Sequence, residues 1–399
     1  MRVLITSWAW PSHYLPLAPL GWALRAAGHE VRVASQPRLT PVILDSGAVA
    51  VHSGPDLDHD QVRAQSMRDL PLVAVPHAPA AGATMRDWAA DPRDMVRRVF
   101  RVFVRYAETM VDELLDYAQA WRPDLVVYEP TSYAGPLVAA ALGVPAVRHV
   151  QGVDVTYQAA ELLPELLAPV CRRLGLSDVD PLGTVTVDPC PPSIQIQAGL
   201  KRIPVRYIPY NGPAVLPEWL YEPAGKPRLV VTWGTSTTRL TGSGTFRPPE
   251  IISATRGLDC ELVIALTGAD AAELGEVPNG VRVVESLALH LLLPGCAAVV
   301  HQGGNGTILT GVHCGVPQLL LPQLPDQTFL ADQFANSGAG IVVRPDQATP
   351  EGLREALGAL LREAAYRQAA ARLRDEALAQ PTPAQIVPVL QALAQHRAS

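Results

Sequence analysis

Short β-branched runs alternate with alanine- and leucine-rich stretches along the first part of the chain. The runs occupy residues 2–6, 29–35, 124–129 and 144–150, and the apolar residues between them recur at helical spacing. Strand and helix patterns that alternate along a chain are typical of a mostly parallel sheet with helices on its faces. The pattern therefore predicts a doubly wound α/β domain at the start of the chain.

The same alternation restarts at residue 228. Its strand-like runs are RLVVTW, CELVIAL, VRVVES, AAVVH, PQLLLP and AGIVV. Between the two series, the prolines and glycines of residues 202–227 exclude a regular helix and mark a linker. A chain of 399 residues is also longer than one core usually supports. We expect an N-terminal Rossmann-like domain over residues 1–209, a linker over 210–227 and a C-terminal Rossmann-like domain over 228–380.

Three further segments carry expectations of their own. Residues 351–379 are typical of an alanine- and arginine-rich helix, and the apolar helix expected at 384–396 needs a surface, which we predict to be the N-terminal domain. The stretch from Pro55 to Met110 interrupts the strand-helix rhythm and is predicted to be an irregular insertion. Long insertions of this kind are often functional. Its apolar residues would suit a hydrophobic ligand or, equally, ordinary packing on the first sheet.

The composition excludes several classes of protein. Hydrophobic residues make up 48% and charged residues 18%, which is a globular balance, and the net charge of -6 disfavours nucleic acid as a partner. The five cysteines include no CxxC pair, which suits reduced thiols in the cytoplasm. The apolar runs are too short for a membrane span, and the N-terminus does not fit an export signal. We therefore expect a cytoplasmic protein.

A glycine-rich loop follows the strand-like run AAVVH. The run ends at His301, Gly303, Gly304 and Gly306 allow close approach to the backbone, and Thr307 adds a hydroxyl in the first turn of the next helix. In open α/β sheets, ligands bind beyond the carboxyl ends of the strands, and the start of a helix favours an anion. The loop fits a diphosphate. The alternative is a glycine-rich turn that binds nothing.

Two other segments are predicted to reach the same edge of the second sheet. Thr235 and Ser236 follow its first strand and offer hydroxyls to an anion. Asp326 and Gln327 could hydrogen-bond several sugar hydroxyls, or could simply begin a helix. The chain lacks GxxxxGK[ST] and has no GxGxxG after its first strand, which disfavours a P-loop ATPase and a nicotinamide-dependent enzyme.

The order HQGGNGT, GVPQLLLP and DQ resembles the nucleotide-sugar signature of inverting glycosyltransferases with the GT-B fold. It resembles especially the bacterial enzymes that attach deoxysugars to antibiotic polyketides. The likeness covers nearly the whole chain, including SWAWPSHYLPLAPLGWALRAAGHEVRVAS, RPDLVVYEPTSYAGPLVAAALGVP, DPCPPSIQ and VTWGTS. The resemblance implies two domains facing each other across a cleft. It also implies transfer from a nucleoside diphosphate sugar, with thymidine diphosphate expected, to a hydrophobic aglycone, without a metal or another cofactor.

The resemblance also assigns roles to residues of the second domain. The donor diphosphate would contact the glycine-rich loop with help from Thr235 or Ser236, and Asp326 and Gln327 would hold the sugar. Relatives carry a tryptophan turn near the nucleobase where this chain has Ser286, so Leu287 would meet the base through its backbone. The expected donor-binding set is Thr235, Ser236, Leu287, His301, Gly303, Gly304, Asn305, Gly306, Thr307, Asp326 and Gln327.

His13 is the candidate general base, since an imidazole can take a proton from an acceptor hydroxyl near neutral pH. It follows the first strand-like run, and the family carries its base at this position. Glu129, at the end of a neighbouring run, would orient His13 and stabilise its charged form. The alternatives are a structural histidine and a plain polar strand end.

These assignments imply a single displacement with inversion at the anomeric carbon. Residues 56–60 and 178–180 contain DxD patterns that bind metals in other glycosyltransferases, but we expect both to be solvated loops. C-glycosylation of an aromatic polyketide remains open, because a base also activates a ring carbon. A non-catalytic sugar-nucleotide-binding protein is the alternative from another class. The sequence leaves the oligomeric state open, a homodimer included.

Overall fold

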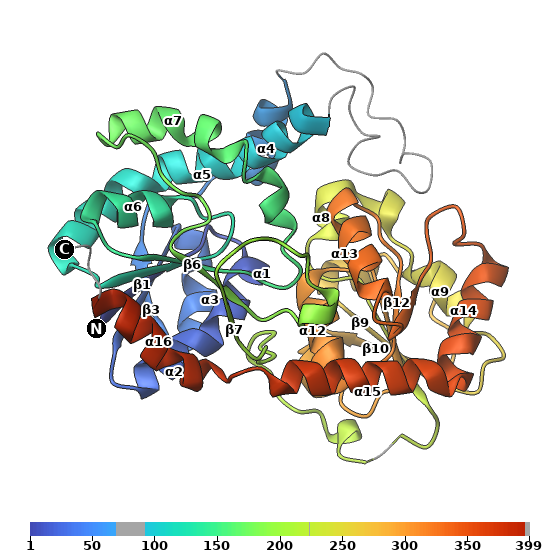
Figure 1. Cartoon of the computed structure of the whole chain (residues 1–399). Coiled ribbons are helices and arrows are strands. Elements are labelled where there is room, and N and C mark those ends of the chain that lie inside the picture. Colours follow the sequence, from blue (N-terminus) through green and yellow to red (C-terminus); the bar gives the residue numbers. More distant parts are fainter. Residues whose placement is uncertain (69–91, 223, 396–399) are drawn as a thin grey trace.

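Two parallel β-sheets, one in each half of the chain, form the framework of the molecule (Figure 1). The computed structural model describes residues 1–68, 92–222 and 224–395. In the first sheet the strand order is β3-β2-β1-β4-β5-β6-β7. Its strands are β1 (Arg2–Thr6), β2 (Glu30–Ser35), β3 (Val49–His52), β4 (Leu125–Tyr128), β5 (Ala146–His149), β6 (Val185–Asp188) and β7 (Arg202–Pro204).

The second sheet has the order β10-β9-β8-β11-β12-β13. Its strands are β8 (Arg228–Thr232), β9 (Glu261–Leu266), β10 (Val281–Glu285), β11 (Ala298–His301), β12 (Gln318–Leu320) and β13 (Gly340–Val342). In each sheet the strand order reverses beside the first strand, because β1 lies between β2 and β4 and β8 lies between β9 and β11. A crevice opens at such a point, at the carboxyl ends of the strands.

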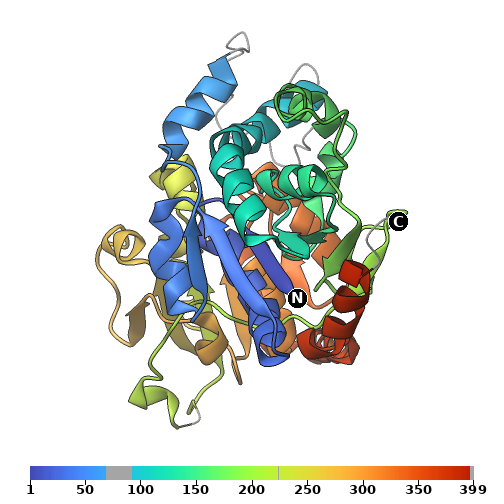
Figure 2. The ribbon, with the colours of Figure 1, turned by 90° about the vertical axis from the view of Figure 1, so that its left-hand side faces the viewer.

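This is the predicted GT-B architecture of two Rossmann-like domains, with the domains side by side in Figure 1 and seen from the N-terminal domain in Figure 2. The central strand β4 is buried along its whole length, as expected for a parallel strand covered on both faces. The helices are α1 (Pro11–Tyr14), α2 (Ala18–Ala26), α3 (Thr40–Asp45), α4 (His59–Arg68), α5 (Pro92–Trp121), α6 (Ala134–Leu142), α7 (Leu163–Arg173), α8 (Thr237–Thr241), α9 (Pro248–Ala254), α10 (Gly268–Ala272), α11 (Leu289–Leu292), α12 (Asn305–Cys314), α13 (Pro325–Ala335), α14 (Pro350–Arg362), α15 (Ala364–Ala379) and α16 (Pro383–Gln395).

The prediction of an irregular insertion from Pro55 to Met110 is wrong for the residues that the structure describes. Helix α4 lies in this segment, and the 30-residue helix α5 begins in it and continues beyond Met110. Buried side chains of α5 recur three or four residues apart and form one apolar stripe against the core, at Val96, Phe100, Val104, Ala107 and Met110. Residues 69–91 of this segment lie outside the described residues, so the prediction that its apolar residues suit a hydrophobic ligand stays a prediction.

The C-terminal segment returns to the first domain (Figure 1). The helix predicted over 351–379 is divided into α14 and α15 at Glu363, whose backbone is extended. Helix α16 packs against α2, and Ile386, Val387 and Leu390 join the core on that face of the first sheet. Among the described residues, no helix is long and apolar enough to cross a membrane.

Candidate active site

His13 and Glu129 form a hydrogen-bonded pair at the carboxyl edge of the first sheet. His13 lies in α1, just after β1, and Glu129 follows β4 directly. Because β1 and β4 are neighbours, the segments that follow them meet. Nδ1 of His13 lies 2.9 Å from Oε2 of Glu129. The Glu129 carboxylate is fully buried, whereas 22% of the His13 side chain is exposed. The His13 ring can therefore be reached from solvent while its acidic partner cannot.

Two residues absent from the predicted set hold this pair. The backbone N–H of Thr131 donates to Oε2 of Glu129 at 3.0 Å, and its hydroxyl donates to Oε1 at 2.7 Å. Nε2 of Gln151 donates to the backbone oxygen of His13 at 3.2 Å and lies 3.4 Å from Oε2 of Glu129. Both residues lie just beyond the ends of β4 and β5, a position that could have marked them as candidates.

Aromatic side chains surround the exposed part of His13. The Trp8 ring meets the His13 ring edge-on at 4.9 Å and stacks with the His59 ring at 5.5 Å. Phe103 and Tyr106 extend this group, which we name the aromatic cluster. Burial lowers the pKa of His59 to about 4, so its ring is neutral near pH 7. The aromatic cluster therefore forms an apolar surface next to the His13 ring.

The glycine-rich loop of the second domain connects β11 to α12. Gly303 has a φ of +96°, a left-handed conformation that favours glycine. Helix α12 begins at Asn305, and at the start of a helix backbone N–H groups lack partners within the helix and favour an anion. No heavy atom outside the local backbone would lie within 4 Å of a Cβ added at Gly306, so the space beside it is open. Thr307 lies in the first turn and is 9% exposed.

His301 is buried beneath this loop. Its Nε2 lies 2.8 Å from Oε1 of Gln318, and its Nδ1 accepts a hydrogen bond from the N–H of Gly303 at 3.0 Å. Burial lowers its pKa to about 4, so the ring is neutral. With both nitrogens engaged and no exposed surface, the side chain supports the loop, and the predicted contact between His301 and a diphosphate does not fit this arrangement.

The side chain of Asn305 points to the first domain instead of into the glycine-rich loop. Its Oδ1 accepts a hydrogen bond from the N–H of Val153 at 3.1 Å, and its Nδ2 donates to the oxygen of Val153 at 3.3 Å. A Cβ added at Gly152 would lie 2.4 Å from Oδ1 of Asn305. The side chain of Asn305 is therefore occupied by Val153, and its predicted contact with a diphosphate would come from its backbone N–H.

Gln327 serves as a helix cap, which differs from its predicted sugar contact. Its Oε1 accepts hydrogen bonds from the N–H groups of Gln323 and Leu324, and its Nε2 donates to the hydroxyl of Thr237 at 2.9 Å. These bonds fix the start of α13 and tie it to α8. Capping was the alternative from the sequence, but the cap is the amide and not the aspartate. Thr237 was not among the predicted residues, although it follows Ser236 directly.

Asp326 faces the cleft. Its side chain is exposed at the surface, and desolvation by the surrounding protein raises its pKa, which the backbone N–H groups of Gln327 and Asp326 partly oppose. The charge that His13 can carry opposes this rise, so the two side chains interact electrostatically across the cleft. The structure therefore brings together the candidate base of one domain and the candidate sugar ligand of the other.

The loop after β8 contacts the first domain. Nε1 of Trp10 donates to the hydroxyl of Ser236 at 3.0 Å, and the guanidinium of Arg239 lies 4.6 Å from the centre of the Trp10 ring. Thr235 is exposed beside them. Gln302, in the facing loop, was not predicted; among the described residues its buried Oε1 has no hydrogen-bond partner. Its place inside the HQGG motif was the available signal.

Leu287 lines an open pocket between the end of β10 and the linker. Ser286 before it has a φ of +52°, an uncommon conformation for a residue with a side chain. Pro213 and Val215 of the linker form the opposite wall. The place where the resemblance puts a nucleobase is therefore an accessible recess, and the base contact of Leu287 stays a prediction.

The acidic patterns have local structural partners. Oδ1 of Asp58 accepts hydrogen bonds from the N–H groups of Asp60 and Gln61 at the start of α4. Oδ1 of Asp180 accepts one from the N–H of Leu182 in a turn. Asp58 and Asp180 thus organise turns, whereas Asp60, which was predicted to lie in the same solvated loop, lies in α4.

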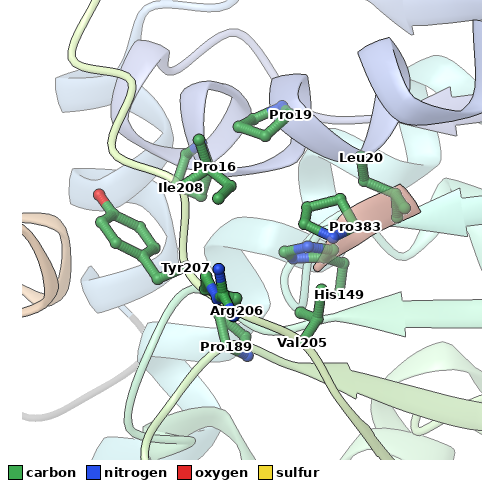
Figure 3. A pocket seen from close by; sticks show the side chains of 10 residues that line it. All are labelled: Pro16, Pro19, Leu20, His149, Pro189, Val205, Arg206, Tyr207, Ile208 and Pro383. Carbon is green, nitrogen blue, oxygen red and sulfur yellow. The ribbon is translucent and has the colours of Figure 1, made fainter. Parts of the chain in front are cut away.

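A small cavity lies away from this cleft, between α2, the chain segment 205–208 and the start of α16 (Figure 3). It is about 10 Å³, enough for about one water molecule. His149 on its wall is fully buried, and burial lowers the pKa of its ring to about 4. This cavity lies within the first domain, where α16 packs against it.

Comparison with known proteins agrees with this geometry. Residues 22–234 match the family model described as the N-terminal domain of erythromycin biosynthesis protein CIII-like proteins, and residues 250–393 match the C-terminal domain model. The chain is 39% identical to a 10-deoxymethynolide desosaminyltransferase of Streptomyces venezuelae, covering 100% of this chain and 98% of that protein. It is 37% identical to a TDP-daunosamine transferase of Streptomyces peucetius, with the same coverage of both chains.

Solved structures give the same answer. A spinosyn rhamnosyltransferase complexed with thymidine diphosphate superimposes with a TM-score of 0.83 at 31% identity, covering 98% of this chain and 100% of that one. The same enzyme complexed with spinosyn aglycone gives a TM-score of 0.84. These relatives are named as transferases, so neither a non-catalytic binding protein nor a nicotinamide-dependent enzyme finds support. The chain belongs to the erythromycin biosynthesis protein CIII-like family of GT-B glycosyltransferases.

Proposed function

We propose that this protein transfers a deoxysugar from thymidine diphosphate to a hydroxyl of a hydrophobic polyketide-type aglycone, with inversion of configuration. The observation that carries the proposal is the pair of His13 and Glu129, which lies opposite Asp326 at the edge shared by the two domains. A base, an orienting carboxylate and a polar group for the sugar are the parts that such a transfer needs.

The donor is held by the second domain in this proposal. The glycine-rich loop and the start of α12 bind the diphosphate through backbone N–H groups, and Thr307 contributes its hydroxyl. The helix dipole favours the charge that grows on the departing diphosphate and contributes about 1–2 kcal/mol. Because these donors come from the protein, the proposed reaction needs no metal or other cofactor. The nucleobase occupies the recess beside Leu287.

The acceptor lies against the aromatic cluster. Phe103 and His59 are its half-buried members, and Trp8 and Tyr106 support them from below. A neutral His59 suits an apolar aglycone, because no charge must be desolvated when the aglycone binds. Two relatives act on such compounds by name, a 10-deoxymethynolide desosaminyltransferase and an aklavinone rhodosaminyltransferase of Streptomyces galilaeus.

The proposed step is one displacement. Nδ1–H of His13 donates to Glu129, which leaves Nε2 to take the proton of the acceptor hydroxyl. The acceptor oxygen forms a bond to the anomeric carbon while the bond from that carbon to the diphosphate oxygen breaks on the opposite face. The glycoside has the inverted configuration, the nucleoside diphosphate leaves with the electron pair, and His13 carries the proton as an imidazolium beside Glu129.

Calorimetric titration with thymidine diphosphate and uridine diphosphate, with and without chelator, tests the donor half of the proposal. We expect saturable binding that prefers thymidine diphosphate and is insensitive to chelator. Binding of neither nucleotide would contradict the donor site, and binding that depends on Mg²⁺ or Mn²⁺ would return the acidic patterns to consideration. A set of polyketide aglycones with a TDP-deoxysugar tests the acceptor half, and acid hydrolysis of the product separates an O-glycoside from a C-glycoside.

A further inference from the structure

Thr131 makes more hydrogen bonds to Glu129 than His13 does, and its side chain is buried. Its backbone N–H donates to Oε2 at 3.0 Å, and its hydroxyl lies 2.7 Å from Oε1 and 2.9 Å from Oε2. On the other side, Nε1 of Trp8 donates to the same hydroxyl at 2.9 Å. Thr131 is 4% exposed and Glu129 is fully buried.

The direction of these hydrogen bonds follows from the chemistry of the groups. An indole nitrogen only donates, so Trp8 occupies an acceptor site of the Thr131 hydroxyl. The single hydroxyl proton is then directed to Glu129, whose ionised carboxylate only accepts. Thr131 thus supplies two donors to one carboxylate, its N–H to Oε2 and its O–H to Oε1.

We propose that Thr131 is a positioning residue, which holds the buried carboxylate of Glu129 so that Oε2 faces Nδ1 of His13. The proposal rests on the proposed function, in which His13 is the base. Without the hydroxyl, the carboxylate keeps the Thr131 N–H and Gln151 at Oε2 but loses its donor at Oε1. Nδ1 of His13 also loses the hydroxyl oxygen that lies 3.3 Å from it.

The placement of the carboxylate determines the tautomer of His13. When Oε2 accepts from Nδ1–H, the lone pair of the ring is on Nε2, the nitrogen that takes the acceptor proton. When Oε1 has no donor, the carboxylate is held less firmly against Nδ1, and the other tautomer gains population and presents an N–H to the acceptor. Thr131 therefore acts on the rate of transfer and not on donor binding.

Valine and serine replacements of Thr131 separate the hydroxyl from the shape of the side chain. Thr131→Val keeps the branched shape and the backbone N–H but removes the hydroxyl, and Thr131→Ser restores it. A hydrogen bond to a charged group accounts for about one to two orders of magnitude in a rate or equilibrium constant. We expect Thr131→Val to lower kcat by about 10–100-fold with unchanged affinity for thymidine diphosphate, and Thr131→Ser to keep kcat within about threefold of wild type.

The pH profile of kcat/KM distinguishes positioning from a packing role. In Thr131→Val the imidazolium form of His13 is less well stabilised, so we expect the acid limb of the profile to move to lower pH. Asp326 and His59 also interact electrostatically with His13, and both are unchanged in the variant. A packing defect would lower the whole profile and the melting temperature without moving the limb.

The outcomes also separate this inference from the proposed function. An active His13→Ala variant would contradict the base, and Thr131 would then have nothing to position. An inactive His13→Ala together with a Thr131→Val variant of wild-type kcat and pH profile would overturn only the role of Thr131. If Thr131→Val fails to fold, Thr131→Ser and Thr131→Ala keep the test: positioning requires serine to match wild type and alanine to shift the acid limb.

Discussion

The side-chain amide of Asn305 pairs with both backbone polar groups of Val153, so the first residue of α12 is joined to the first domain. Gln151, two residues earlier in the same segment, donates to the backbone of His13. The loop of residues 151–153 therefore connects the start of α12 with His13. Three consecutive residues thus contact both the segment that carries His13 and the first residue of α12.

Replacement of Asn305 tests this connection. Asn305→Ala removes two hydrogen bonds between the domains, so we expect kcat to fall by about tenfold while the affinity for thymidine diphosphate changes by less than about threefold. Calorimetry and steady-state kinetics measure the two effects. Affinity that falls tenfold or more would mean that the side chain contacts the diphosphate after all. Because a Cβ at Gly152 meets Asn305, Gly152→Ala should cost less activity in the Asn305→Ala background than in wild type.

Removal of the imidazole of His13 should separate binding from chemistry. His13→Ala is expected to cut transfer by about 10²–10⁴-fold, the usual contribution of general base catalysis, and to leave donor affinity nearly unchanged. His52→Ala is the matched control, because His52 is exposed and its ring lies 2.9 Å from the hydroxyl of Thr40 on the surface of the same domain. Normal turnover in His13→Ala would remove this residue from the mechanism.

Glu129→Gln tests the charge of the orienting group at nearly constant volume. An amide cannot stabilise the imidazolium as a carboxylate does, so kcat should fall by about 10²–10⁴-fold while nucleotide affinity is retained. Glu30→Gln, an exposed change at the start of β2, controls for loss of negative charge. Equal kcat in Glu129→Gln and wild type would show that the contact with His13 is structural.

Thr307→Val tests the donor side. Loss of a hydroxyl that bonds a charged phosphate should weaken thymidine diphosphate binding by about 10–100-fold, because such bonds contribute about 1.5–3 kcal/mol. Calorimetric affinity is the measurement, and His13→Ala, which should bind normally, is the comparison. Unchanged affinity in Thr307→Val would place the diphosphate elsewhere.

Buried histidines predict the pH dependence of stability. The pKa of His149 falls from the ordinary 6.5 to about 4 because its ring is buried, so the unfolded chain binds a proton more readily than the folded one between these values. The contribution of the neutral His149 ring to the free energy of unfolding is fully present above pH 6.5 and is lost as the pH falls from there through about 4. We expect a free energy of unfolding lower by up to about 3 kcal/mol per such histidine at pH 4.

Urea denaturation at pH 7 and pH 4.5 measures this loss. His149→Gln should lose less stability between the two pH values than wild type, since its side chain does not titrate. His52→Gln should behave like wild type, because His52 is exposed. An equal loss in wild type and His149→Gln would mean that His149 is not buried in its neutral form.

The strands predicted from β-branched runs recur within two residues in β1, β2, β4, β5 and β8–β13. The inner strands are continuously apolar because both faces are covered, and the edge strands β10 and β13 keep β-branched residues although they are partly exposed. The strands that the pattern missed are β3, β6 and β7. They are short and near the edges of the first sheet, where proline or polar residues break the run, as in Arg202–Pro204. Pairing with neighbours, which no local pattern records, makes these segments strands.

For the site, the sequence by itself determined which chemistry lies at the strand ends: a histidine and an acid in one domain, and glycines before a helix in the other. Only the tertiary structure decided where side chains point. His301, Asn305 and Gln327 belong to motifs, yet their side chains serve the loop, the domain contact and a helix cap, because buried polar groups must find partners wherever packing supplies them. Thr131 and Gln151 hold Glu129 for the same reason, and these partners, distant in sequence, exist only after folding.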